Sequence, residues 1–137
     1  EVQNTINNRI KDDTQYLETN SGMRVSITPK YSNSMILVTF DITGQSTSTW
    51  GKCKIMRSYD GGSNFSDLKN SSGSAITYGA YGAQMVDDNA GYAPLVSFDF
   101  PNTTDEIVYN GFMKAPANHY WPHSSTTNFA YAMEIKQ

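Results

Sequence analysis

The sequence predicts an all-β domain, on the strength of three observations. Short runs of alternating apolar and polar residues recur along the chain, most clearly at residues 34–43 and 128–137. Clusters of Gly, Pro, Asn and Ser separate these runs, as is typical of turns. Beyond the first twenty residues, helix signals are lacking and the period is two rather than 3.6. Many short strands interrupted in this way indicate an antiparallel β-sandwich, and we expect a jelly-roll-like one.

The totals fit one domain with an ordinary core, since the chain has 137 residues of which 38% are hydrophobic. A net charge of −3 gives no attraction to phosphate backbones, so we expect neither nucleic acid nor anionic membranes as partners. We expect no membrane insertion either, because no apolar run approaches the ~20 residues that span a bilayer. Cys53 is the one cysteine, which excludes an internal disulfide, and its position predicts a buried small hydrophobe.

The expected strands follow one another along most of the chain. They cover residues 23–30, 34–43, 52–58, part of 65–78, 95–100, 107–113, a short piece at 119–121, and 128–137. The strongest run places Ile36, Val38, Phe40 and Ile42 on one face. Its other face begins with Met35 and Leu37, so we expect a second sheet or a neighbouring subunit to cover the strand there.

The same alternation predicts which side chains of the other strands point inward. The predicted inward residues are Val25 and Ile27, then Cys53 and Ile55, then Val96, Phe98 and Phe100, and in the last strand Phe129, Tyr131, Met133 and Ile135. The closing strand is therefore expected to be half buried, with its large residues in the core and small or polar residues between them.

The first 21 residues are predicted to form a polar N-terminal arm or a connection to a shaft, ahead of the sandwich at residues 22–137. Val2, Ile6 and Ile10 are spaced by four, which suits a short amphipathic helix or the end of a coiled coil. An extended arm would also place them on one face, and we favour that form. The arm is expected to pack against a partner chain or the edge of the sandwich. Because the chain opens with Glu1, we expect it to be a piece of something longer.

No catalytic motif is present, so we expect a protein that is not an enzyme and needs no cofactor. Adjacent acids such as those at residues 12–13, 87–88 and 105–106 point to opposite sides of a strand and are best explained by loop solvation. His119 and His123 flank Pro122, which disfavours a chelating helix, and we expect no metal site. The turn at residues 60–64 lacks the acidic density of a strong calcium site.

Aromatic residues outside the predicted strands suggest a binding surface. Trp50, Tyr81 and Tyr92 lie in or beside loops rich in Gly, Ser and Thr, where they either stack on sugar rings or cover sheet ends and subunit seams. If the strands alternate in direction after the arm, the loops at 43–50, 79–94 and 114–119 gather at one end. The turns at 30–33, 59–64 and 101–105 then gather at the other. The candidate receptor-binding residues of the first end are Trp50, Tyr81, Asp87, Asp88, Tyr92 and His119.

Four motifs, in order, carry a resemblance to a known family. They are Gly-Met-Arg-Val-Ser-Ile-Thr-Pro at 22–29, Ser-Asn-Ser-Met-Ile-Leu-Val at 32–38, a Pro-Asn-Thr-Thr turn leading to a strand with Tyr at 101–109, and Met-Glu-Ile at 133–135. With these the chain resembles the distal domain of bacteriophage tail-fibre proteins of the kind common in marine cyanophages. It departs from that pattern at residues 119–123 and 79–94, where receptor choice would vary.

The resemblance implies a homotrimer at the tip of a virion tail fibre. Such a domain would bind a bacterial surface glycan or an outer-membrane protein during host adsorption. Trimer formation would also cover Met35, Leu37 and the N-terminal arm. The alternatives are a carbohydrate-binding module of an enzyme, a structural fibre or capsid decoration protein, and a depolymerising enzyme.

Overall fold

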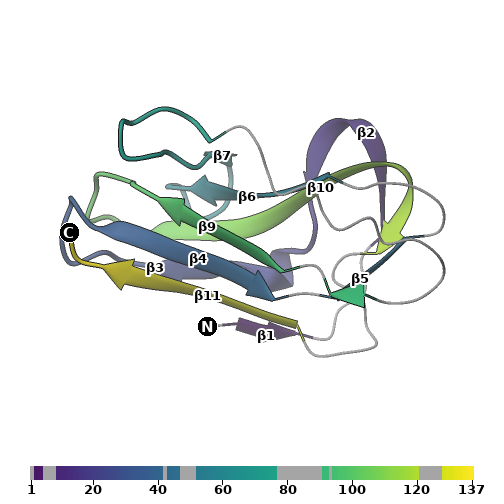
Figure 1. Ribbon diagram of the computed structural model, residues 1–137, viewed down its shortest axis with the longest axis horizontal. Coiled ribbons are helices and arrows are strands. Elements are labelled where there is room, and N and C mark those ends of the chain that lie inside the picture. The colour runs from purple at the N-terminus through teal and green to yellow at the C-terminus, as the bar shows by residue number, and fades with distance from the viewer. Residues whose placement is uncertain are drawn as a thin grey trace.

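The computed structural model describes residues 2–4, 9–41, 43–46, 52–76, 91–92, 94–120 and 128–137, the backbone alone at 2–4, 9–13, 43–46, 91–92 and 116–120. This part of the chain is all-β, with antiparallel sheets that curl (Figure 1). Within it the one helical element is the 3-10 turn η1 (Ser21–Met23). Asn20 caps this turn, since its side chain accepts a hydrogen bond of 2.7 Å from the Gly22 amide. The prediction of an all-β fold is confirmed.

The first of two sheets has four strands in the order β1–β11–β4–β9. Their bounds are Val2–Asn4 for β1, Asn128–Ile135 for β11, Met35–Asp41 for β4 and Leu95–Asp99 for β9. All pairings are antiparallel, and β4 lies between β11 and β9, with Leu37 opposite both Met133 and Phe98. We call this the four-stranded sheet.

The larger sheet is organised around β10 (Ile107–Tyr120). Its remaining strands are β2 (Arg9–Glu18), β3 (Val25–Ile27), β5 (Thr43–Ser46), β6 (Lys52–Ser58), β7 (Ser66–Asp67) and β8 (Gly91–Tyr92). Strand β10 pairs antiparallel with β6, β5, β2 and β3, so four separate segments of the chain meet on one strand. The weak strand expected within 65–78 is reduced to β7 and a bridge between Lys69 and Ala75.

The predicted break after Met113 is wrong, because β10 continues to Tyr120 without becoming a loop. Pro116 lies inside this strand and cannot donate a ladder hydrogen bond. The pairing with β2 accommodates it by shifting register between Ala115 and His119, which face Asp12 and Ile10. A β-bulge of this kind lets a strand continue past a proline. It also interrupts the alternation of apolar and polar residues, so the sequence pattern predicts that the strand ends there.

The N-terminal segment is extended where the structure describes it, as β1 and β2. Val2 pairs with Ala130 of β11, whereas Arg9 and Glu18 pair with Tyr120 and Phe112 of β10. The favoured extended form of the arm is therefore observed at these residues. The partner of β2 is the larger sheet of the same chain.

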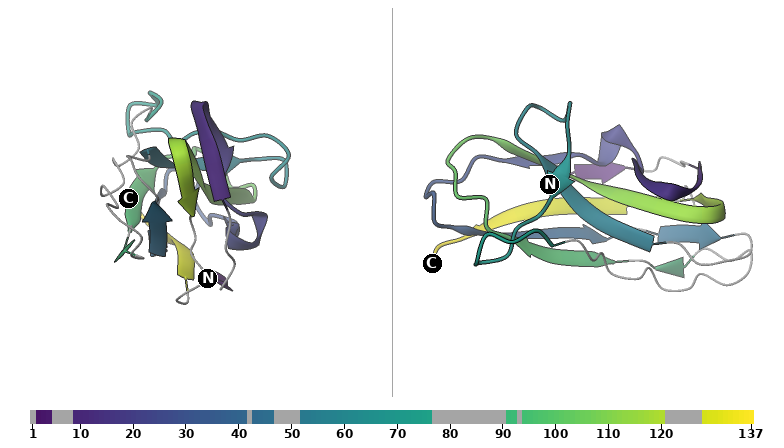
Figure 2. Two further views of the ribbon diagram at one scale, coloured as in Figure 1. Left: turned by 90° about the vertical axis from the view of Figure 1, so that its right-hand side faces the viewer. Right: turned by 90° about the horizontal axis from the view of Figure 1, so that it is seen from above.

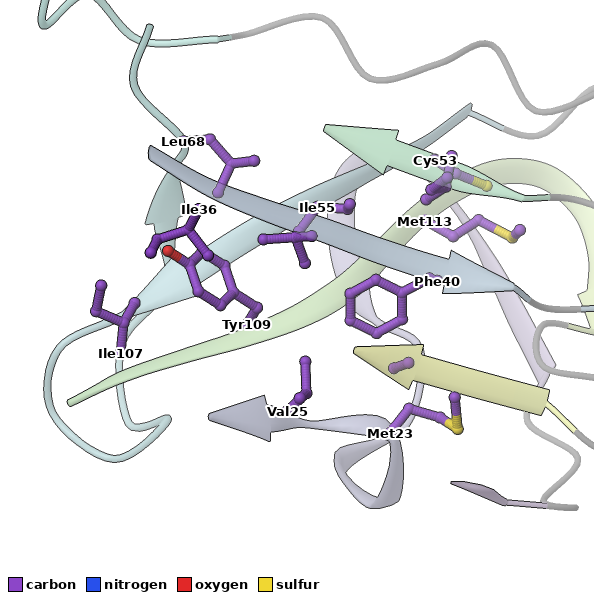
Figure 3. Close-up of a cluster of buried hydrophobic side chains, with 13 residues drawn as sticks. Met23, Val25, Ile36, Phe40, Cys53, Ile55, Leu68, Ile107, Tyr109 and Met113 are labelled. Atoms are coloured by element: carbon purple, nitrogen blue, oxygen red, sulfur yellow. The ribbon is translucent and has the colours of Figure 1, made fainter. Parts of the chain in front are cut away.

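Both sheets contribute to one core cluster (Figure 3). Alternate residues of β4 and β6 meet there, as predicted. The buried members from these two strands are Ile36, Val38, Phe40, Cys53 and Ile55. The other residues labelled in Figure 3 are Met23 of η1, Val25 of β3, Leu68, and Ile107, Tyr109 and Met113 of β10. Each fully buried aliphatic or aromatic side chain of this size contributes about 1.5–3 kcal/mol to folding.

The predicted orientation is wrong for β9 and β11. In β9 the buried residues are Leu95 and Asp99, and Val96 and Phe98 point away from the core. In β11 the small residue Ala130 is buried, whereas the larger Tyr131 and Met133 are exposed. Alternation identifies two faces but does not say which one is covered. Here the core beside Ala130 is already occupied by large residues such as Phe40, its partner in the ladder.

Two turns are built around one side chain each. Asp60 Oδ1 accepts hydrogen bonds from the amides of Ser63 and Asn64, at 3.0 and 2.9 Å. Gly61 and Gly62 adopt the positive φ that the turn requires, 68° and 89°, as expected from the sequence. Asn70 Oδ1 organises the segment at 71–74 in the same way, accepting from the amides of Ser72 and Ser74.

Candidate functional site

The predicted receptor-binding residues lie partly outside the described chain. Trp50, Tyr81, Asp87 and Asp88 fall outside the described residues. Tyr92 lies in β8 and His119 in β10, with β5 between the two strands. Thr43 of β5 is opposite Tyr92, and Ser46 of β5 is opposite His119. Strand pairing thus brings two of the six predicted positions to one end of the larger sheet.

The opposite end of the molecule holds the three turns that were expected to gather. The carboxylate of Glu134 accepts hydrogen bonds from the amides of Lys30 and Tyr31, which joins the β3–β4 turn to the end of β11. Tyr59 Oη donates to the Pro101 carbonyl at 3.3 Å, which joins the two other turns. Figures 1 and 2 show β5 and the C-terminus at opposite ends of the long axis.

A second candidate surface is the outer side of the four-stranded sheet, of which the sequence predicted only the part on β4 that begins with Met35 and Leu37. Four large side chains on this side are exposed, namely Val96 (60%), Phe98 (46%), Tyr131 (40%) and Met133 (49%). Leu37 and Thr39 lie between them on β4, opposite Phe98 and Met133 in one row and Val96 and Tyr131 in the next. We call these six residues the apolar face.

The apolar face is uncharged, because none of its six members is ionised at neutral pH. It continues through Met35 and Ile135, which are opposite each other and half buried. The sequence did contain a signal for it. A strand that alternates Tyr131 and Met133 with Ala130 and Ala132 can bury either set, and the small set fits beneath an already crowded core.

The outer side of the larger sheet is different in character, since it is built from charged and aromatic contacts. The Nζ atoms of Lys54 and Lys114 lie 4.4 and 5.1 Å from the centre of the Tyr16 ring. Arg24 forms a two-pronged ion pair with Glu18, at 2.6 and 2.8 Å. Together these contacts supply a polar surface over β2 and β10.

Two of the described acids, Asp60 and Asp99, have several structural partners. Hydrogen bonds from Ser58, Asn64 and neighbouring amides hold the pKa of Asp60 well below its usual range, so this carboxylate is occupied by its own turn. Asp99 is buried against Arg57, Tyr109 and the Lys69 amide. Burial raises the pKa of the Cys53 thiol to about 12.

The described residues contain neither a candidate metal site nor a candidate membrane-spanning helix. In that part of the chain, no three His, Cys, Asp or Glu residues are grouped so that they could hold a metal ion. The same residues contain no helix with the length and apolar character needed to cross a membrane.

Comparisons of the chain with protein-family models, curated proteins and solved structures found no match.

Proposed function

We propose that this chain is the distal, receptor-binding domain of a phage tail fibre, a jelly-roll-like β-sandwich that acts as a homotrimer on the virion. The ordered series of four motifs is the observation that carries this proposal. The motifs fall at η1 and β3, at the turn into β4, at the turn into β10 and at the end of β11. The resemblance therefore involves turns and strands from both sheets rather than one hairpin.

Receptor binding is assigned to the end where β5, β8 and β10 meet. Two candidate positions, Tyr92 and His119, have their backbones there. Strand β1 runs antiparallel to β11, toward this same end, and β2 returns from it along β10. Loops on a rigid strand scaffold are a common location for recognition residues. The ligand class is a bacterial surface glycan or an outer-membrane protein.

Adsorption would depend on avidity, because three weak sites on one particle bind far more tightly than one. The domain itself would perform no covalent chemistry. In the described residues the buried acid Asp99 is saturated by structural partners and Cys53 is a buried thiol of raised pKa.

The test is competition with phage adsorption by the purified domain. The wild-type domain should block adsorption, whereas Trp50→Ala and Tyr92→Ala should reduce blocking with little change in Tm. Tyr31→Ala is the matched control, since Tyr31 is an exposed tyrosine in the β3–β4 turn at the other end. Equal blocking by all four proteins would refute the assignment of the loops.

The same incubation separates the other functions. Polysaccharide of unchanged chain length is expected, and shortening would identify a depolymerase. A monomer that binds isolated glycan but does not block adsorption would identify a carbohydrate-binding module. A trimer that neither blocks adsorption nor binds glycan would be a structural decoration protein.

A further inference from the structure

We infer that the apolar face of the four-stranded sheet is where a second copy of this chain packs. This inference rests on the proposed homotrimer and names the surface that builds it. The orientation of the strands, the charge of the surface and its area favour a second copy as the occupant.

The two strands that flank β4 turn large apolar side chains away from the core. Strand β11 places Tyr131 and Met133 outward and buries Ala130. On the other side of β4, β9 exposes Val96 and Phe98 although Leu95 is buried. Large apolar side chains on the outer side of two strands flanking β4 give one contiguous patch, and such patches mark interaction sites.

Charge favours contact through this face over contact through the outer side of the larger sheet. The chain has a net charge of −3, so two copies repel each other over most approaches. The six residues of the apolar face contain no ionisable carboxylate or amine. The faces of three copies can therefore meet around a three-fold axis without placing like charges of the face against one another, whereas the outer side of the larger sheet presents Lys54, Lys114 and Glu18.

The exposed area of the face suits the centre of an interface. An aromatic side chain such as Phe98 or Tyr131 buries roughly 150–250 Å² when fully covered, so the four exposed side chains together offer on the order of 400 Å² at their observed exposure. A stable interface buries about 800 Å² of each partner, with an apolar centre and a polar rim. The apolar face is the right size for that centre, and Leu37 and Thr39 close the gap between its two sides.

The experiment places one carboxylate in the face and measures mass in solution by light scattering. Phe98→Asp and Met133→Asp should each raise the concentration at half association by about tenfold or more, because an unpaired charge would be buried between copies. Ser26→Asp adds the same charge at an exposed position of β3 and should leave association unchanged. Circular dichroism checks that each variant is folded.

A second measurement needs no variant. Met133 is exposed in the single chain, so association should protect it from peroxide oxidation, and dilution should remove that protection. Met56 of β6, on the larger sheet, is the internal control and should be oxidised at a rate independent of concentration.

The outcomes separate this inference from the function that it rests on. Association lost in both face variants and Met133 protected by concentration would support it. A multiple of the chain mass that neither variant changes would overturn the surface but leave the oligomer standing. A domain that blocks adsorption as a monomer would overturn the surface and the trimer, while the receptor-binding role would survive. Protection of Met133 by added glycan alone would also overturn the inference, since the face would then be a ligand site.

Discussion

Asp99 of β9 accepts a hydrogen bond of 2.5 Å from Nη1 of Arg57 in β6, and this buried ion pair joins the two sheets. The side chains are 0% and 2% exposed. The Asp99 carboxylate accepts two further hydrogen bonds, one from Tyr109 Oη and one from the Lys69 amide, both of 2.8 Å. Arg57 is less satisfied, since its buried Nε has no hydrogen-bond partner.

Removing one member of this pair should be severely destabilising. Asp99→Asn leaves the Arg57 guanidinium buried without its counter-ion, which typically costs about 3–5 kcal/mol in the free energy of unfolding. Urea denaturation measures this loss, and Asp105→Asn at an exposed turn is the control. If both variants unfold at the same urea concentration, the ion pair has no structural role. The double variant Arg57→Met, Asp99→Leu should recover much of the loss, because an apolar pair needs no counter-ion.

Tyr109→Phe removes one of the donors to Asp99 and should cost about 1–2 kcal/mol. Burial, followed by the Asp99 charge, raises the pKa of Tyr109 above that of a free phenol. The neutral phenol is therefore favoured in the folded state. The stability linked to it is fully present below pH ~10 and is lost as the pH rises further. The difference in unfolding free energy between wild type and Tyr109→Phe should shrink in strong alkali. A difference independent of pH would contradict the raised pKa.

Glu134 ties the last strand to the β3–β4 turn through the amides of Lys30 and Tyr31 and the hydroxyl of Ser34. The Ser34 hydroxyl is the main cause of a pKa below the usual glutamate value, and the amides add to it. A lowered pKa gives stability that is present above pH ~4.5 and is lost as the pH falls through the folded value. Glu134→Gln should thus lower Tm at pH 7 but make little difference near pH 2. Glu106→Gln, at an exposed position, should have no such profile.

The two glycines of the β6–β7 turn should differ in their tolerance of alanine. Both have positive φ, so each substitution carries backbone strain of about 1 kcal/mol. At Gly61 a Cβ meets no atom within 4 Å, whereas at Gly62 it would overlap the Arg24 guanidinium. Gly62→Ala should consequently lower Tm more than Gly61→Ala, because it also disturbs the ion pair of Arg24 with Glu18. Equal Tm values would show that Arg24 moves without cost.

Cys53 should resist thiol reagents in the folded protein. It is buried in the core cluster, and burial raises its pKa to about 12, so the reactive thiolate is scarce at pH 8. A disulfide reagent should therefore label Cys53 only after denaturation in urea. Rapid labelling of the native protein would place this residue at the surface.

The sequence predicts the buried face correctly for the strands whose two faces differ in polarity. Ile36, Val38 and Phe40 were assigned to the core correctly, as were Cys53 and Ile55, because their neighbours include polar or charged residues. The sequence did not predict the buried face correctly where both faces of a strand carry residues that can be buried. Val96 and Phe98 were expected in the core because aromatic and branched residues are usually buried. Strand β9 instead buries its other face, which places Asp99 beside Arg57.

The sequence contains a signal for the buried ion pair between Arg57 and Asp99. Arg57 follows Cys53 and Ile55 at the same inward phase of β6, and a buried guanidinium requires an acid nearby. Which acid supplies the charge depends on strand order, since Asp99 is 42 residues away along the chain. Of the predicted receptor site, Tyr92 and His119 are placed at one sheet end by pairing with β5, a relation that no local pattern contains.

The solution mass of the unmodified domain is the sharpest test of the proposed homotrimer, on which the proposed function depends. Light scattering over a range of concentrations should give three times the chain mass of 15.2 kDa. A mass of 15.2 kDa at every concentration would contradict the account.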